Sequence, residues 1–162
     1  MLFVVFKAGD TRYALDVERV VEVVPRILLQ RCPGAPEIVA GLFSYRGTCV
    51  PVIDLCRILA GRPCKSNLGS RVIVSRYKAA DGRERLVGFL AEVVSETTDV
   101  AEAEFGQAGV APAGIPFLGR LAIDDTGMLQ RVHLDRVLPD ALDHILFDAP
   151  GKEVMANGGR PV

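Results

Sequence analysis

The stretch from Gly41 to Asp54, with the sequence GLFSYRGTCVPVID, most constrains what this chain can fold into. Its β-branched and aromatic residues fall into two short runs, which is typical of strands half buried in a sheet. Arg46 and Gly47 separate the runs, and a glycine can adopt the positive φ of a tight turn. Pro51 has no N–H for a strand ladder, so the second run is predicted to be an edge strand or to carry a bulge.

Arg46 at this predicted turn has two interpretations. Its guanidinium presents a rigid, always charged fork of donors, which suits the recognition of a partner. Alternatively, it forms a structural ion pair with a nearby carboxylate. In either case we expect Arg46 to pair with Glu22, which precedes it by one long loop, in a partly buried pair that fixes the orientation of the guanidinium.

The pattern Gly41-x4-Arg46-Gly47-x3-Pro51-x2-Asp54-Leu55 resembles the signature of CheW-like domains, the coupling proteins of bacterial chemosensory arrays. Residues 6–17, 20–24 and 35–40 resemble the flanking segments of that family, and the resemblance extends over about residues 1–147. The family usually has Asn-Leu where this chain has Ser44-Tyr45, a departure that bears on the receptor partner rather than the fold. Ser-Tyr at this place also resembles the Wsp-type surface-sensing couplers.

The resemblance implies an all-β fold of two interlocked five-stranded SH3-like β-barrels with a groove between them. It implies that the cytoplasmic tip of a chemoreceptor docks in the groove, and that the regulatory domain of a CheA-type histidine kinase pairs with a barrel. By position, the receptor-binding residues are Gly41, Tyr45, Arg46 and Gly47. The family's segment of partner contacts carries over to Val20, Glu22 and Val24, with core packing as the alternative for the valines.

Composition restricts the classes of partner. The 162 residues suffice for one domain or two small, intimate ones, and the net charge of −1 comes without a basic stripe. Nucleic acid is therefore not an expected partner. The hydrophobic share is 49%, yet no apolar run approaches the roughly 20 residues of a membrane-spanning helix. We expect apolar faces buried against partner proteins, and no signal peptide in Met1–Phe6, which lacks a basic n-region.

The four cysteines, at positions 32, 49, 56 and 64, form no Cys-x-x-Cys, and the chain has two histidines. A zinc site needs about four ligands at tighter spacing, so neither metal nor cofactor is expected. Cys49 alternates with Val50 in a strand and is predicted to pack as a small hydrophobe. The simplest interpretation of all four is a reduced, cytoplasmic protein.

Catalysis has little support in the sequence. Cys56 or Cys64 with His133 could form a nucleophile pair, but no motif supports one. Asp124-Asp125 could bind a metal, but Asp-Asp-x-Gly is typical of a hairpin turn. The resemblance to CheW-like domains implies instead a non-catalytic adaptor that couples chemoreceptors to a kinase. The alternative is a regulatory module that acts on a kinase without receptor contact.

The remaining predicted elements follow hydrophobic periodicity and punctuation by Gly and Pro. Besides the central hairpin, strands are predicted at residues 2–7, 12–16, 20–24, 71–77, 86–94, 117–123 and 128–134. The strand at 86–94 is expected to continue over 97–100 past a bulge, and 101–116 is the longest loop. Helical segments are predicted at 17–19, 36–40, 55–60 with Asp54 as its cap, after Asp135, and over 139–147; residues 148–162 are expected to be a disordered tail.

Overall fold

The structure, a computed structural model, describes residues 1–26, 29–79, 81–100, 105–106, 115 and 117–138. Within these ranges the elements are, in chain order, β1 (Leu2–Ala8), β2 (Thr11–Asp16), η1 (Val17–Arg19), β3 (Val20–Pro25), β4 (Val39–Tyr45), β5 (Thr48–Asp54), α1 (Leu55–Ala60), β6 (Arg71–Lys78), β7 (Glu84–Ala91), β8 (Val93–Asp99), β9 (Leu118–Asp124), β10 (Gly127–Val132) and η3 (Leu134–Arg136).

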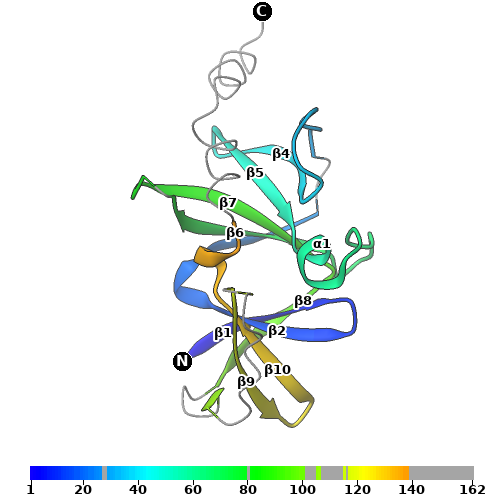
Figure 1. Ribbon diagram of the computed structural model, residues 1–162, viewed down its shortest axis with the longest axis vertical. Helices are drawn as coiled ribbons and strands as arrows, with labels where there is room; N and C mark the ends of the chain where they lie inside the picture. The colour runs from blue at the N-terminus through cyan, green and yellow to red at the C-terminus, as the bar shows by residue number, and fades with distance from the viewer. Residues whose placement is uncertain (27–28, 80, 101–104, 107–114, 116, 139–162) are drawn as a thin grey trace, which may run out of the picture.

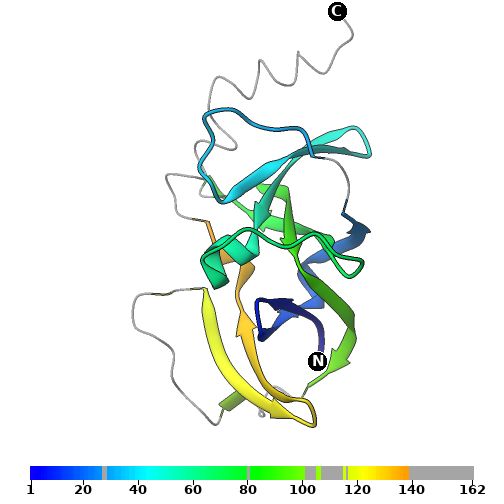
Figure 2. The same ribbon diagram turned by 90° about the vertical axis from the view of Figure 1, so that its right-hand side faces the viewer.

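The strands form two five-stranded sheets that share the chain in an interlocked order. The first sheet has the order β8-β1-β2-β10-β9 and the second the order β3-β6-β7-β5-β4. The chain begins in the first sheet, builds all of the second, and returns through β8 to complete the first. The hairpins β9–β10 and β4–β5 lie toward opposite ends of the long axis (Figures 1 and 2). The predicted all-β fold of two interlocked, five-stranded SH3-like units is confirmed.

Strand β1 is buried on both faces, which explains its continuous apolar run. Phe3 and Val5 point into a cluster inside the first sheet, with Leu129 among its members. Val4 and Phe6 point the other way, into the larger cluster that also contains Val52 and Phe89 of the second sheet. Because successive side chains of a strand alternate in direction, one strand supplies both cores. The large cluster therefore joins the two sheets.

The second sheet closes on itself through the chain that follows β3. Gln30 and Leu42 exchange two backbone hydrogen bonds of 2.8 Å, so this segment pairs with edge strand β4. Strand β5 is not the edge strand that Pro51 suggested, since it lies between β4 and β7. Its parallel pairing with β7 covers only Val52 to Asp54, so Pro51 precedes the segment that is paired on both sides. A register shift does occur in the β4–β5 ladder, between Val39 and Gly41.

The helix predictions had mixed outcomes. Asp54 caps α1 as expected, accepting hydrogen bonds from the N–H groups of Cys56 (2.9 Å) and Arg57 (3.2 Å), and Gly61 ends the helix in the left-handed conformation. The helix predicted over 36–40 is wrong: a turn occupies this place and β4 begins at Val39. The strand predicted over 86–94 is two strands, β7 and β8, which belong to different sheets. The helix at 139–147 and the tail at 148–162 lie outside the described residues.

Two predictions about the cysteines are corrected. Cys56 and Cys64 form a disulfide with a Cα–Cα separation of 5.0 Å, so they are not the reduced thiols that were predicted. Asp54 holds both ends of the short loop between them, and this brings the two side chains together. Cys49 is exposed rather than packed in the core, because Val50, its neighbour in β5, takes the inward position. Cys32 and Cys49 are free thiols.

Candidate functional site

The tight turn of the β4–β5 hairpin holds Arg46 in a left-handed backbone conformation, which residues other than glycine rarely adopt. Tyr45 and Thr48 form the last pair of the ladder, which leaves a two-residue loop of Arg46 and Gly47. Both loop residues have positive φ, 49° and 82°, as the type I′ hairpin turn demands. Arg46 is the only non-glycine residue with positive φ among the described residues, so the turn places this arginine at a backbone cost.

Two contacts orient the Arg46 guanidinium. Nη2 donates a hydrogen bond of 3.1 Å to Oε1 of Glu22, which confirms the predicted pair. The guanidinium carbon also lies 5.2 Å from the centre of the Tyr45 ring, within the range of a cation–π contact. The expected burial is wrong: the Arg46 side chain is 74% exposed and that of Glu22 40%. The remaining donors of Arg46 are therefore accessible to another molecule.

Glu22 belongs to edge strand β3, whose residues alternate between two environments. Val20, Glu22 and Val24 are half buried, and the two valines pack against the large core cluster. Val21 and Val23, which point the opposite way, are exposed. Of the three residues predicted as a partner interface, Glu22 is thus the one whose polar group reaches the surface beside Arg46.

Gly41 and Tyr45 have structural roles at this site. A Cβ on Gly41 would lie 2.6 Å from the carbonyl oxygen of Gln30, and the residue's φ is +153°. Gly41 thus allows the chain after β3 to approach β4. Tyr45 is buried in the core cluster, and its hydroxyl has no hydrogen-bond partner among the residues that the structure describes. Whether Gly41, Tyr45, Arg46 and Gly47 bind a receptor remains a prediction, as does the groove that the resemblance implies.

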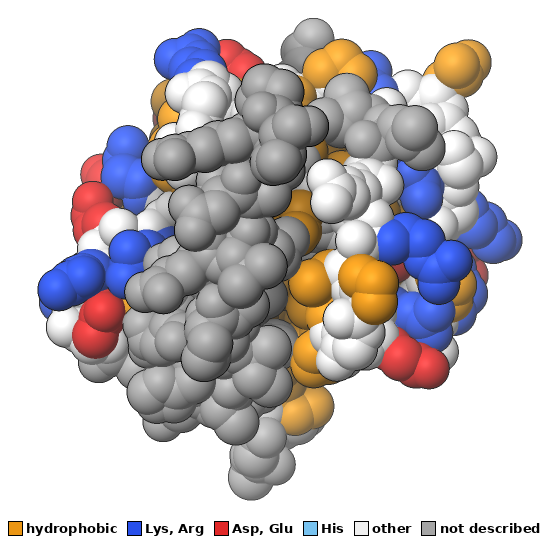
Figure 3. Space-filling view, turned by 90° about the horizontal axis from the view of Figure 1, so that it is seen from above, with side chains coloured by type: hydrophobic (Ala, Val, Ile, Leu, Met, Phe, Trp, Pro, Cys, Tyr) orange, Lys and Arg blue, Asp and Glu red, His pale blue; other side chains and the backbone are white. Residues whose placement is uncertain are grey.

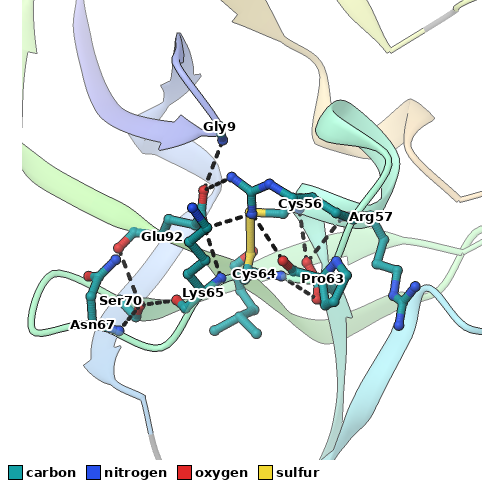
Figure 4. A network of polar contacts seen from close by, with 12 residues as sticks. Gly9, Cys56, Arg57, Pro63, Cys64, Lys65, Asn67, Ser70 and Glu92 are labelled. Atoms are coloured by element: carbon teal, nitrogen blue, oxygen red, sulfur yellow. Dashed lines mark hydrogen bonds and ion pairs between the residues drawn. A yellow bond between two sulfur atoms is a disulfide. The ribbon is translucent and has the colours of Figure 1, made fainter.

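Sequence reasoning missed the carboxylate of Glu92, which ties the two sheets together (Figure 4). Arg62 forms a two-pronged contact with it, from Nη1 to Oε2 (2.9 Å) and from Nη2 to Oε1 (2.8 Å). The backbone N–H of Lys65 donates to Oε2 (2.8 Å) and that of Gly9 to Oε1 (2.9 Å). These donors lower the pKa of Glu92 to about 2, with the Arg62 hydrogen bonds as the largest cause. The sequence did carry one signal of this site, because Glu92 is the single acidic residue in the apolar run of residues 86–94.

Two acidic residues have structural partners rather than metal-binding roles. Asp124 accepts two hydrogen bonds of 2.8 Å from Arg12 of β2, and this pairing is the main cause of its lowered pKa of about 2. It also accepts from Thr126 N, the turn chemistry that the sequence predicted. Asp54 lies within 4.8 Å of the Cys56 and Cys64 sulfurs, but both its oxygens already accept backbone hydrogen bonds. The two sulfurs are joined in the disulfide, whereas the thiolate is the form of cysteine that binds metal ions.

The described surface carries exposed apolar side chains as well as mixed charges (Figure 3). In the face seen from above, apolar side chains gather in a band, with basic and acidic side chains mixed on either side (Figure 3). Exposed apolar residues elsewhere include the cross-strand neighbours Ile123 and Met128 at the β9–β10 turn. No helix within the described residues is long and apolar enough to cross a membrane.

Comparisons with known proteins agree with this architecture. The family model of the CheW-like domain matches residues 2–142. The Chemotaxis protein CheW of Helicobacter pylori is 28% identical over 102 residues, 63% of this chain and 59% of that protein. Protein FrzA of Myxococcus xanthus is 33% identical over 72 residues, 44% of this chain and 45% of FrzA. The matched part of this chain thus spans about half to three fifths of these relatives.

A solved structure extends the likeness to most of the fold. The crystal structure of the scaffolding protein TtCheW from Thermoanaerobacter tengcongensis aligns with a TM-score of 0.72 at 25% identity, covering 85% of this chain and 87% of that one. The family model, for its part, matches well over half of the chain. This chain belongs to the CheW-like domain family.

Proposed function

We propose that this protein is a non-catalytic adaptor that couples the cytoplasmic tip of a chemoreceptor to a CheA-type histidine kinase in a bacterial chemosensory pathway. It acts in the cytoplasm, is recruited to receptor arrays at the membrane, and needs no cofactor. Family membership supports this proposal, together with the names of the relatives, two of which are a chemotaxis protein and a scaffolding protein. The Wsp-type assignment, made from Ser44-Tyr45, remains a prediction about the pathway.

The exposed, oriented guanidinium of Arg46 is the single observation that carries the receptor side of the proposal. Glu22 and the Tyr45 ring hold it in one place, while its exposed fraction of 74% leaves donors for a partner. A positioned charged group binds better than a mobile one, because less conformational entropy is lost on binding. The receptor surface is accordingly expected to carry a carboxylate or backbone carbonyls opposite Arg46.

The partner segment of β3 takes a defined role in this proposal. Glu22 orients Arg46 and adds an acceptor to the binding surface, while Val20 and Val24 fix the position of Glu22 by packing on the core. Kinase pairing uses a barrel surface away from the Arg46 turn. The two partners can then bind at the same time, which is what an adaptor requires.

Binding titrations of the full-length protein with a receptor tip and with the kinase regulatory domain test the proposal. We expect Arg46→Ala to weaken receptor binding about tenfold, or about 1.4 kcal/mol, and to leave kinase binding unchanged. Arg46→Lys should restore only part of the affinity, because an ammonium group lacks the planar fork. Arg120→Ala, which removes an exposed arginine of β9 at the other end of the molecule, is the matched control.

Other outcomes distinguish the alternatives. Kinase binding without receptor binding by the unaltered protein would favour a regulatory module that acts on the kinase alone. Equal loss of both partners by Arg46→Ala, together with a large drop in melting temperature, would show a purely structural arginine. Receptor binding that is insensitive to Arg46→Ala would move the receptor site elsewhere.

A further inference from the structure

The disulfide between Cys56 and Cys64 lies under a loop that contacts both sheets. Cys56 is the second residue of α1, and Cys64 is in the loop of residues 61–70 that leads to β6. Cys56 is fully buried and Cys64 is 7% exposed, so the pair is at the inner edge of the loop (Figure 4). The exposed fraction of Leu68, at the outer edge, is 96%.

Polar contacts link the disulfide to the junction of the sheets. Asp54 receives the backbone N–H of Cys64 (3.0 Å), and the next residue, Lys65, donates its N–H to Glu92 (2.8 Å). Glu92 also receives the Gly9 N–H from the β1–β2 turn of the first sheet. It stands between β7 of the second sheet and β8 of the first. The order of the loop is therefore coupled to the contact that holds the sheets together.

We propose that Cys56 and Cys64 form a thiol–disulfide exchange site, which is oxidised by small disulfides and reduced by thioredoxin-like dithiols. This proposal rests on the proposed function, which places the protein in the reducing cytoplasm. Disulfides in that compartment are usually transient and either catalytic or redox-sensing. The Cα–Cα separation of 5.0 Å lies within the window of about 4.4–6.8 Å that a disulfide requires. The backbone thus holds the two cysteines at a distance that allows the disulfide to form.

The reduction step balances as a two-electron transfer. A thiolate of the dithiol attacks Sγ of Cys64, the less buried of the two residues; a mixed disulfide forms and Cys56 leaves as a thiolate that takes up a proton. The second thiolate of the dithiol then attacks the dithiol's first sulfur, which is bonded to Cys64 in the mixed disulfide. The two sulfurs of the dithiol become bonded to each other, and the Cys64 thiolate is released and takes up a proton. The dithiol has become a disulfide, and two electrons and two protons have passed to the cysteines.

Reduction removes a covalent restraint but leaves the polar contacts of Asp54 and Glu92 in place. The loop then opens more often, because only hydrogen bonds and the Arg62 pair hold it against Glu92. A disulfide that closes a loop of this length is expected to raise the melting temperature by about 5–10 °C in a protein of this size. The amides of residues 61–70 should exchange with solvent faster in the reduced protein.

The test uses the native full-length protein. It is equilibrated with oxidised glutathione or with dithiothreitol, and thiols are then counted by alkylation and peptide mass. We expect the treatments to differ by two thiols, at Cys56 and Cys64, and the reduced form to melt about 5–10 °C lower with faster exchange in residues 61–70. The matched control is a Cys32→Ser/Cys49→Ser variant, which keeps the response, whereas Cys56→Ser abolishes it.

Two outcomes would overturn the proposal. If glutathione leaves Cys56 and Cys64 as free thiols, the pair does not oxidise in the folded protein. If dithiothreitol reduces the disulfide only after denaturant is added, the disulfide is a fixed structural bond. Neither readout involves a receptor or a kinase, so this result is separate from that of the binding titrations.

Discussion

At the scale of single residues, Glu92 shows what a buried charge can contribute when its donors are all in place. Its side chain is 7% exposed, and Arg62, Lys65 and Gly9 supply the hydrogen bonds that replace water. A buried carboxylate without such donors would bind a proton instead. Here the pKa falls, from 4.5 to about 2, so the folded protein favours the charged form.

Glu92→Gln is predicted to lower the free energy of unfolding by about 2–3 kcal/mol at pH 7, since the Gln amide would set a donor against Arg62. The folded-state pKa is depressed, so the contribution of Glu92 is complete above pH 4.5 and disappears as the pH falls to about 2. Urea unfolding at several pH values should show the difference between variant and wild type narrowing through that window. Glu84→Gln, at an exposed position of β7, is the control. A difference that stayed constant down to pH 2 would contradict this account.

The pair of Arg46 and Glu22 was predicted correctly, but its degree of burial was not. The burial of these two side chains depends on how the sheet curves, and the identity of the residues does not determine that curvature. Because the Arg46 side chain is 74% exposed and that of Glu22 40%, solvent screens their attraction. Glu92 was missed for a related reason: its partners Gly9 and Arg62 stand 83 and 30 positions away, and only the fold brings them together.

A double-mutant cycle of Arg46→Ala and Glu22→Ala should therefore give a coupling free energy of only about 0.2–1 kcal/mol in stability. A partly buried pair, as the sequence predicted, would give a larger coupling free energy. Chemical denaturation of the two single variants and the double variant measures it, and added salt should reduce it further. A coupling well above 2 kcal/mol would mean that the pair is shielded from solvent.

At the scale of elements, apolar periodicity and turn residues predicted most strands of the described chain, and tertiary pairing decided the exceptions. The strand at residues 2–7 was recognisable because both of its faces are buried, which makes its apolar run continuous. The helix predicted over 36–40 rested on Pro36, whereas pairing of β4 with β5 already begins at Val39. The change of sheet between β7 and β8 leaves no mark in the hydrophobic pattern except Glu92 itself.

Gly41 gives an element-scale prediction, because it decides whether the chain after β3 can pair with β4. Gly41→Ala should destabilise the protein by about 3 kcal/mol, since the new Cβ would lie 2.6 Å from the Gln30 carbonyl oxygen. Gly82→Ala is the matched control: it also has a positive φ, +83°, but nothing lies within 4 Å of its Cβ position. That variant should lose only about 1 kcal/mol. Equal thermal shifts in the two variants would exclude the close approach as the cause.

At the scale of the whole molecule, the two sheets depend on each other through the chain order and the shared core. The first sheet is completed only by β8, β9 and β10, which follow the entire second sheet in sequence. The pairings β2–β10 and β5–β7 are parallel and join distant segments. Such pairings cannot be deduced from local patterns, which is why the barrel arrangement was implied by the family resemblance alone.

The shared core predicts that the two sheets unfold in one transition, and β1 allows a matched test. Phe6 and Phe3 are both fully buried on this strand, but Phe6 faces the cluster common to both sheets and Phe3 the cluster of the first sheet. Phe6→Leu and Phe3→Leu should each cost about 1–2 kcal/mol and shift a single calorimetric transition. Because unfolding is shared, hydrogen exchange in β6 and β7 should accelerate in both variants, including Phe3→Leu, whose side chain does not touch that cluster. Acceleration confined to the first sheet in Phe3→Leu, or a second transition on heating, would show that the sheets unfold independently.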